Sequence, residues 1–108
     1  MYRIGQEEID AVAKVIEQRS LFKINKKLQE TMHAEEEMKT LFGTKYPLLM
    51  TNGYAALTCA LIGMGIGPGD EVIVPAYTYI STAMAVVSAG AMPVIAEVDE
   101  TLTLCPED

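Results

Sequence analysis

Residues 71–98, EVIVPAYTYISTAMAVVSAGAMPVIAEV, contain two apolar runs on either side of a segment with helical character. The runs EVIV (71–74) and MPVIAEV (92–98) are short and rich in Val and Ile, and Gly and Pro stand near their ends, which predicts strands. The segment between them predicts a helix over 80–89 that Gly90 closes. A strand, a helix and a second strand with short connections predict parallel strands joined by a right-handed helical crossover.

The same alternation begins further upstream in the chain. YPLLM (46–50) predicts another strand, with a proline tolerated near its beginning. Residues 54–64 predict a helix, and IGPGD (66–70) predicts a tight turn into the strand EVIV. The expected fold class is therefore α/β, with a β-α-β-α-β order of parallel strands. The helix has one apolar face, which comprises Leu57, Ala60, Leu61 and Met64.

The N-terminal part alternates charged and apolar residues in a helical pattern. We expect one helix over 6–19 and a second over 25–42, with Gly43 as its C-terminal stop. The predicted domain organisation is a helical segment over 1–45, followed by the α/β part over 46–108. The apolar stripe of the first helix comprises Ile9, Val12, Val15 and Ile16, and that of the second Leu28, Met32, Met38, Leu41 and Phe42.

Charge is distributed unevenly along the chain. The net charge is −7, which disfavours nucleic acid as a partner because a phosphate backbone is bound by clustered Lys and Arg. All eight Lys and Arg side chains lie at or before Lys45, and residues 46–108 carry seven acids and no base. An anion bound in this second part must therefore rely on backbone dipoles or on groups from elsewhere.

The number of cysteines and the apolar runs of the sequence indicate whether the protein is expected to be secreted, membrane-spanning or cytoplasmic. Cys59 and Cys105 are too few and too far apart for a disulfide framework, and the N-terminus lacks a secretory apolar region, so we expect a cytoplasmic protein. The uncharged runs 46–69 and 72–96 are long enough to span a membrane. Gly and Pro interrupt both runs and no Lys or Arg flanks the second, so a buried parallel sheet is the favoured interpretation and no membrane is expected.

Two loops follow the carboxyl ends of predicted strands, where ligands bind in open parallel sheets. In the first, TNGYAAL (51–57), the first turn of a helix leaves backbone N–H groups unpaired at the positive end of the helix dipole. Gly53 would let a phosphate approach the backbone without a Cβ in the way. A plain strand-to-helix turn explains the same residues, and local features leave the two interpretations equally favoured.

The second loop, PAYTYIST (75–82), carries Tyr77 and Tyr79. A tyrosine on this rim can stack on a planar ligand ring while its hydroxyl stays in water. The alternative is a pair of half-buried rim aromatics, which the residues alone favour.

Other candidate motifs lack the context that their chemistry needs. The glycines at 63, 65, 67 and 69 end a helix, whereas a dinucleotide fingerprint opens one after a strand. His33 has no second histidine beside it, so no metal site is expected. Ser81 has no histidine on its own rim, which leaves a hydrolase triad without support.

The ordered set of these features resembles one family. The run from TNGYAALTCALIGMGIGPGDEVIVP through AYTYISTAMAVVSAGAMPVIAEVDETLTLCPED is similar to the N-terminal part of the DegT/DnrJ/EryC1/StrS aminotransferases. These are pyridoxal-phosphate (PLP) enzymes that put amino groups onto keto-sugars or keto-cyclitols. The implied fold is the start of the large domain of aminotransferase fold type I. SLFKIN (20–25) lacks the glycines expected in that connection.

The resemblance implies roles for four residues. The backbone N–H groups of Gly53, Tyr54 and Ala55 stand where the family binds the cofactor phosphate. Tyr54 departs from the family pattern, in which a small hydroxyl residue is commoner. Tyr79 matches the aromatic residue that stacks on the pyridine ring.

The resemblance also implies groups that this sequence does not supply. The Schiff-base lysine and the acid on the pyridine nitrogen come from later in a longer chain, and all six lysines here precede the cofactor loops, so no catalytic residue is assigned. We therefore expect a fragment that is inactive alone. Because a three-stranded parallel sheet with apolar faces normally needs further layers to cover both sides, we also expect the isolated piece to self-associate or to be poorly soluble. Its parent is expected to be a homodimer that takes an amino group from Glu or Gln. The alternatives are a non-catalytic α/β fragment or interaction module and, less favoured, a dinucleotide-binding α/β enzyme.

Overall fold

The computed structural model describes residues 4–24 and 27–108. The chain divides into two compact units, 1–49 and 50–108, each of which is described by itself. The first unit contains α1 (Gln6–Glu17) and α2 (Glu30–Phe42). The second contains α3 (Gly53–Gly63), β1 (Glu71–Pro75), α4 (Ser81–Ser88) and β2 (Met92–Ala96).

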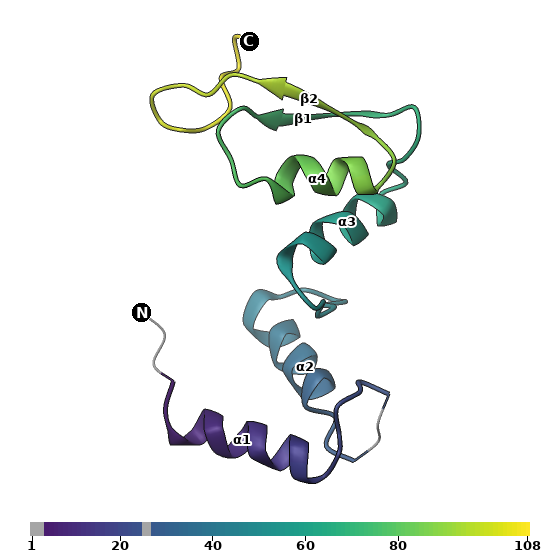
Figure 1. Cartoon of the computed structure of the whole chain (residues 1–108), viewed down its shortest axis with the longest axis vertical. Coiled ribbons are helices and arrows are strands. Elements are labelled where there is room, and N and C mark those ends of the chain that lie inside the picture. Colours follow the sequence, from purple (N-terminus) through teal and green to yellow (C-terminus); the bar gives the residue numbers. More distant parts are fainter. Residues whose placement is uncertain (1–3, 25–26) are drawn as a thin grey trace. The chain divides into compact units, whose positions relative to one another are not determined.

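The strands β1 and β2 pair in parallel, as the sequence predicts. The register runs from Glu71 opposite Met92 to Pro75 opposite Ala96. The crossover between them is α4, which lies along one face of the pair, and α3 packs against α4 (Figure 1). The strand-helix-strand order of residues 71–98 is therefore confirmed.

The core of this second unit lies between α4 and the sheet. Four small side chains are buried in this unit, and Leu61 of α3 packs against the cluster that three of them, Val74, Val86 and Ala91, form. Successive strand residues face opposite sides of a sheet, so Val74 is buried while its neighbour Ile73 is 64% exposed. The second face of the pair therefore presents apolar side chains to solvent in the part of the chain that the structure describes. The buried side chains are Val74, Ala85, Val86 and Ala91.

The helices α3 and α4 end in the same way, with a glycine in the left-handed conformation. After α3, Gly65 has φ +83°, and the N–H of Ile66 donates to the Leu61 carbonyl. After α4, Gly90 has φ +87°, and the N–H of Ala91 donates to the Val86 carbonyl. This hydrogen-bond pattern is the Schellman motif, and after each of the two helices it turns the chain sharply back toward the sheet.

The predicted strand YPLLM (46–50) is wrong: this segment has no regular structure. Among the described residues the sheet has two strands, and neither pairs with this segment. Pro47 has no N–H to donate, and the Leu49 N–H donates to the Glu35 carboxylate instead. An apolar run becomes a strand only where a neighbour accepts its hydrogen bonds, and that neighbour is not among the described residues.

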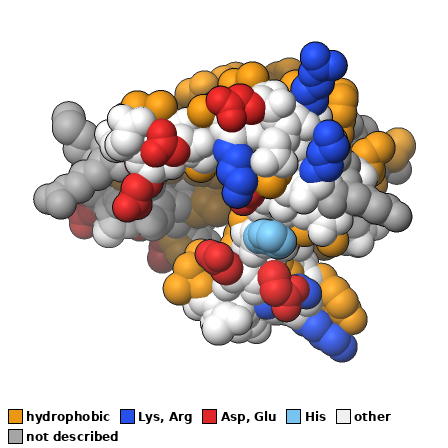
Figure 2. Space-filling model, turned by 90° about the horizontal axis from the view of Figure 1, so that it is seen from below, with side chains coloured by type: hydrophobic (Ala, Val, Ile, Leu, Met, Phe, Trp, Pro, Cys, Tyr) orange, Lys and Arg blue, Asp and Glu red, His pale blue; other side chains and the backbone are white. Residues whose placement is uncertain are grey.

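The first unit contains two helices, as predicted, with shorter bounds. The second helix begins later than predicted: α2 begins at Glu30, since Gln29 has φ +56° and residues 27–29 are not helical. Residues 25 and 26 of that prediction lie outside the described residues. The apolar stripe of α1 is exposed at Ile9, Val12 and Ile16. Figure 2 shows acidic and basic side chains beside hydrophobic ones on the surface.

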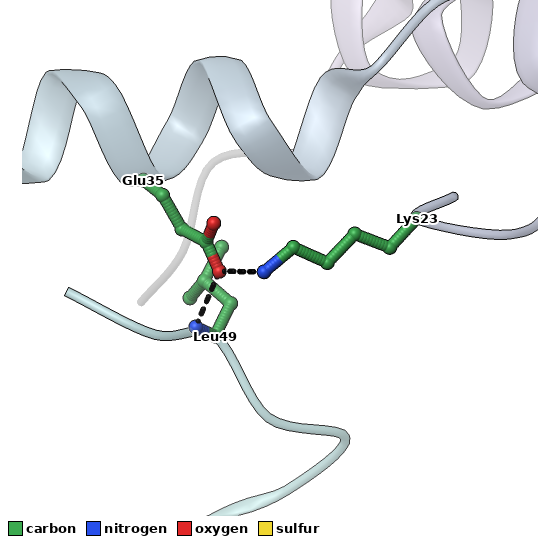
Figure 3. Close-up of polar contacts among 3 residues, drawn as sticks. All are labelled: Lys23, Glu35 and Leu49. Carbon is green, nitrogen blue, oxygen red and sulfur yellow. Dashed lines mark hydrogen bonds and ion pairs between the residues drawn. The ribbon is translucent and has the colours of Figure 1, made fainter. Parts of the chain in front are cut away.

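A carboxylate on α2 connects two other parts of the first unit. Glu35 Oε1 accepts from Lys23 Nζ at 2.5 Å and from the Leu49 backbone N–H at 2.9 Å (Figure 3). The hydrogen bond from Lys23, followed by that from Leu49, lowers the pKa of the Glu35 carboxyl below its ordinary value of 4.5. The ionised form of Glu35 is therefore the one that this unit stabilises.

We expect this contact to weaken in acid. A pKa that is lower in the folded than in the unfolded chain adds stability above pH 4.5, and that stability is lost as the pH falls through the lowered folded value. Urea unfolding from pH 7 to pH 2 should show the wild type losing its advantage over Glu35→Gln below pH 4.5. Glu36→Gln is the control, because Glu36 pairs with Lys39 on the same helix and accepts no backbone N–H. An advantage over Glu35→Gln that persists at pH 2 would contradict this assignment.

Candidate functional site

An open pocket of about 880 Å³ lies at the carboxyl-end side of β1, within the second unit. Its walls come from the start of α3, the loop after β1 and the start of α4. Both predicted loops, TNGYAAL and PAYTYIST, therefore contribute to one pocket, and its volume is in the range typical of small-molecule sites. The lining residues are Asn52, Gly53, Tyr54, Ala56, Leu57, Tyr79, Ser81 and Thr82.

Asn52 determines how α3 begins. Its backbone is extended, its side-chain Oδ1 accepts the Ala55 N–H at 2.8 Å, and its carbonyl accepts the Ala56 N–H at 3.1 Å. Asn is among the best N-cap residues because its short side chain reaches this amide. An Asn directly before a helical segment is the usual sequence signal for an N-cap, and this role of Asn52 was missed in the prediction from sequence.

Two backbone N–H groups in the first turn of α3 remain free. Gly53 and Tyr54 donate to no acceptor within the described ranges, since the first turn of a helix lacks intrahelical partners. The structure differs from the prediction at Ala55, whose N–H is already taken by Asn52 Oδ1. A Cβ built on Gly53 would meet no protein atom within 4 Å, so the space beside this turn is open. Gly53 and Tyr54 are the donors available to an anion.

Tyr79 lines the pocket from the loop before α4. The residue is 78% exposed, and its carbonyl accepts the Thr82 N–H at 2.9 Å, which holds its backbone at the helix start. Tyr77 is also exposed but does not line the pocket. The structure thus separates the two tyrosines that the sequence placed on one rim. Ser81 and Thr82, to which the sequence analysis gave no binding role, add hydroxyl groups to the wall.

The pocket is uncharged. Residues 46–108 contain no Lys or Arg, and Asp70 and Glu71 stand at the opposite end of β1. An anion there would be held by N–H dipoles, which contribute only about 0.3–2 kcal/mol, so a ligand must also gain from contact with the ring. No cluster of potential metal ligands occurs among residues 4–24 and 27–108. Over the same ranges, every helix is too short or too polar to cross a bilayer.

Comparison with known proteins decides the family. The model of the DegT/DnrJ/EryC1/StrS aminotransferase family matches residues 2–108. The chain belongs to this family. The resemblance that the sequence motifs indicate is therefore confirmed, and so is the α/β fold class.

Relatives and solved structures of the DegT/DnrJ/EryC1/StrS aminotransferases agree with this membership. The spore coat polysaccharide biosynthesis protein SpsC of Bacillus subtilis is 41% identical over 104 residues, which are 95% of this chain and 26% of SpsC. The UDP-2-acetamido-2-deoxy-3-oxo-D-glucuronate aminotransferase of Pseudomonas aeruginosa is 39% identical over 79 residues, 72% of this chain and 22% of that protein. The PLP form of a Streptococcus pneumoniae protein assigned as a sugar aminotransferase superposes with a TM-score of 0.80 at 29% identity, covering 94% of this chain and 25% of that one.

The chain spans about a quarter of the length of the curated relatives it matches. The part it shares contains the pocket described above, at the start of α3 and α4. Family membership thus concerns a segment that carries a pocket lined by Gly53 and Tyr54, whose amides are free among the described residues, and by Tyr79.

Proposed function

We propose that residues 50–108 supply the phosphate-binding and ring-binding part of a PLP site in an aminotransferase. The observation that carries the proposal is that Gly53 and Tyr54, whose backbone N–H groups have no acceptor among the described residues, line the same pocket as Tyr79. Membership in an aminotransferase family over residues 2–108 supports it. Beyond family membership, we propose that the N–H groups of Gly53 and Tyr54 and the ring of Tyr79 bind the cofactor.

The residues present fit such a cofactor. The open space beside Gly53 admits a phosphate group, and the N–H groups of Gly53 and Tyr54 are donors at the positive end of the α3 dipole. The exposed ring of Tyr79 offers a flat apolar surface for a pyridine ring. When bound, PLP supplies an electron sink that stabilises negative charge on the carbon next to the transferred amino group. The described residues bind and orient it.

For the complete protein we propose the transfer of an amino group from Glu or Gln to an acceptor. The acceptor is either a nucleotide-linked keto-sugar or a keto-cyclitol. The relative that acts on a UDP-linked 3-oxo sugar supports the first acceptor class. Because residues 46–108 contain no lysine, the lysine that such chemistry needs would come from another part of the complete protein. We place this protein in the cytoplasm as a homodimer. An assay of the complete gene product with Glu or Gln and a UDP-linked 3-oxo sugar tests this part.

Cofactor binding by the 108-residue chain tests the site itself. We expect weak PLP binding that perturbs the cofactor absorbance, falls with added salt and is competed by inorganic phosphate, because dipoles alone hold the anion. Tyr79→Ala should lower PLP affinity by about two- to tenfold, the range for one aromatic stacking contact. The affinity of the Tyr79→Ala variant for inorganic phosphate should not change.

Tyr77→Ala is the matched control, since Tyr77 is an exposed tyrosine of the same loop that does not line the pocket. Equal losses in the two variants would contradict the role of Tyr79. An unperturbed cofactor spectrum in the wild type would overturn the proposed site and favour a non-catalytic interaction module.

A further inference from the structure

A hydrogen bond between two hydroxyl groups joins the helices that form the pocket walls. Tyr54 OH in the first turn of α3 is paired with Ser88 Oγ, the last residue of α4. The two residues are 34 positions apart in the chain. Tyr54 lines the pocket and is 37% exposed, whereas Ser88 does not line it. The hydroxyl of Tyr54 is therefore bonded to a residue outside the pocket lining.

The position of this bond matters because the first turn of α3 carries the unpaired N–H groups of the proposed phosphate site. The N–H groups of Gly53 and Tyr54 have no acceptor in the part of the chain that the structure describes, so no hydrogen bond of their own sets their direction there. Their direction depends on whatever holds the turn. Asn52 caps it on one side, and the chain before Asn52 forms no strand that could support it. A helix end frays readily, so a second attachment to a packed helix adds order.

We propose that Tyr54 is a positioning residue whose hydroxyl, bonded to Ser88, holds the first turn of α3 against α4. This contact keeps the N–H groups of Gly53 and Tyr54 directed at the phosphate group of the ligand. The inference rests on the proposed function for the identity of that ligand. It gives the tyrosine side chain a task different from that of a small hydroxyl residue, which could contact a phosphate directly.

Substitution at Ser88 separates positioning from direct contact. If the Tyr54 hydroxyl bound the ligand itself, Ser88→Ala would free that hydroxyl and affinity would hold or rise. If it positions the turn, Tyr54→Phe and Ser88→Ala each break the same bond and have the same effect. The double variant should then be no worse than either single one, because a shared interaction is lost only once.

The experiment compares PLP, inorganic phosphate and pyridoxal as ligands of the 108-residue chain. We expect Tyr54→Phe and Ser88→Ala to lower affinity for PLP and phosphate by about two- to tenfold, the range for one hydrogen bond. Ser88→Thr keeps a hydroxyl and should retain affinity. Pyridoxal has no phosphate, so its binding should be the same in all variants. Unchanged phosphate affinity in Tyr54→Phe, or equal losses for pyridoxal, would overturn the proposal.

Amide exchange gives a readout that needs no ligand. The N–H groups of Ala55 and Ala56 are bonded to Asn52 and report on the first turn of α3. They should exchange faster in Tyr54→Phe and Ser88→Ala than in the wild type or Ser88→Thr. A wild type that binds no PLP would overturn the proposed function, whereas unchanged exchange in both variants would overturn the role of Tyr54.

Discussion

Replacing Val86 by aspartate is expected to unfold residues 50–108. Val86 is 2% exposed and sits in a core of only four buried side chains. An uncompensated buried charge costs roughly 3–5 kcal/mol. The core of a unit of this size rarely supplies more than about 3–5 kcal/mol of stability, so the substitution removes most or all of it. Circular dichroism followed during heating should show no cooperative thermal transition in Val86→Asp.

The neighbouring residue provides a matched control for this prediction. Val87 lies on the same helix but is 49% exposed, so Val87→Asp introduces the same charge where water can solvate it. We expect Val87→Asp to unfold within a few degrees of the wild type. A similar loss of structure in the two variants would show that the charge itself, and not its burial, is responsible.

The second large effect is expected at the start of α3. Gly53→Asp places a carboxylate beside the free N–H groups, where it occupies the open space and repels a phosphate. Two unit charges about 4 Å apart interact by roughly 4 kcal/mol at an effective dielectric constant of 20. We therefore expect PLP affinity to fall on the order of a hundredfold or more. Calorimetric titration measures this change.

The same substitution should not harm the fold. Acidic side chains are favourable at a helix N-terminus, and a Cβ on Gly53 meets no protein atom, so the thermal midpoint should hold or rise slightly. Gly63→Asp adds the same charge at the other end of α3, about 15 Å away along the helix and beyond the Debye length at physiological salt. The affinity of the Gly63→Asp variant for PLP should change little. Comparable losses at positions 53 and 63 would mean that net charge, and not this site, controls binding.

Much of the second unit could be predicted from the sequence because its signals are local. Gly65 and Gly90 end helices as expected, since a left-handed residue closes each helix through hydrogen bonds to the preceding turn. The strands β1 and β2 follow from short apolar runs between turn residues. Their parallel pairing agrees with the helix between them. Parallel neighbours need a long crossover, usually a helix, whereas antiparallel neighbours can be joined by a tight hairpin.

The candidate site was only partly predictable. The sequence placed Gly53, Tyr54 and Tyr79 on loops at one edge of the sheet, and the structure lines one pocket with all three. It did not reveal that Ala55 donates to Asn52. Whether an amide is free depends on where a neighbouring side chain turns, and a residue pattern does not specify that.

By itself, the sequence determined the order of the elements from α3 to β2, the missing positive charge in residues 46–108 and the family. These depend on residue identity and on bonds between near neighbours. Only the tertiary structure decided that 46–50 is not a strand, and that Tyr54 is bonded to Ser88. The physical reason is the same in both cases: a hydrogen bond between distant segments needs a partner brought to the right place, and the fold alone determines where that partner lies.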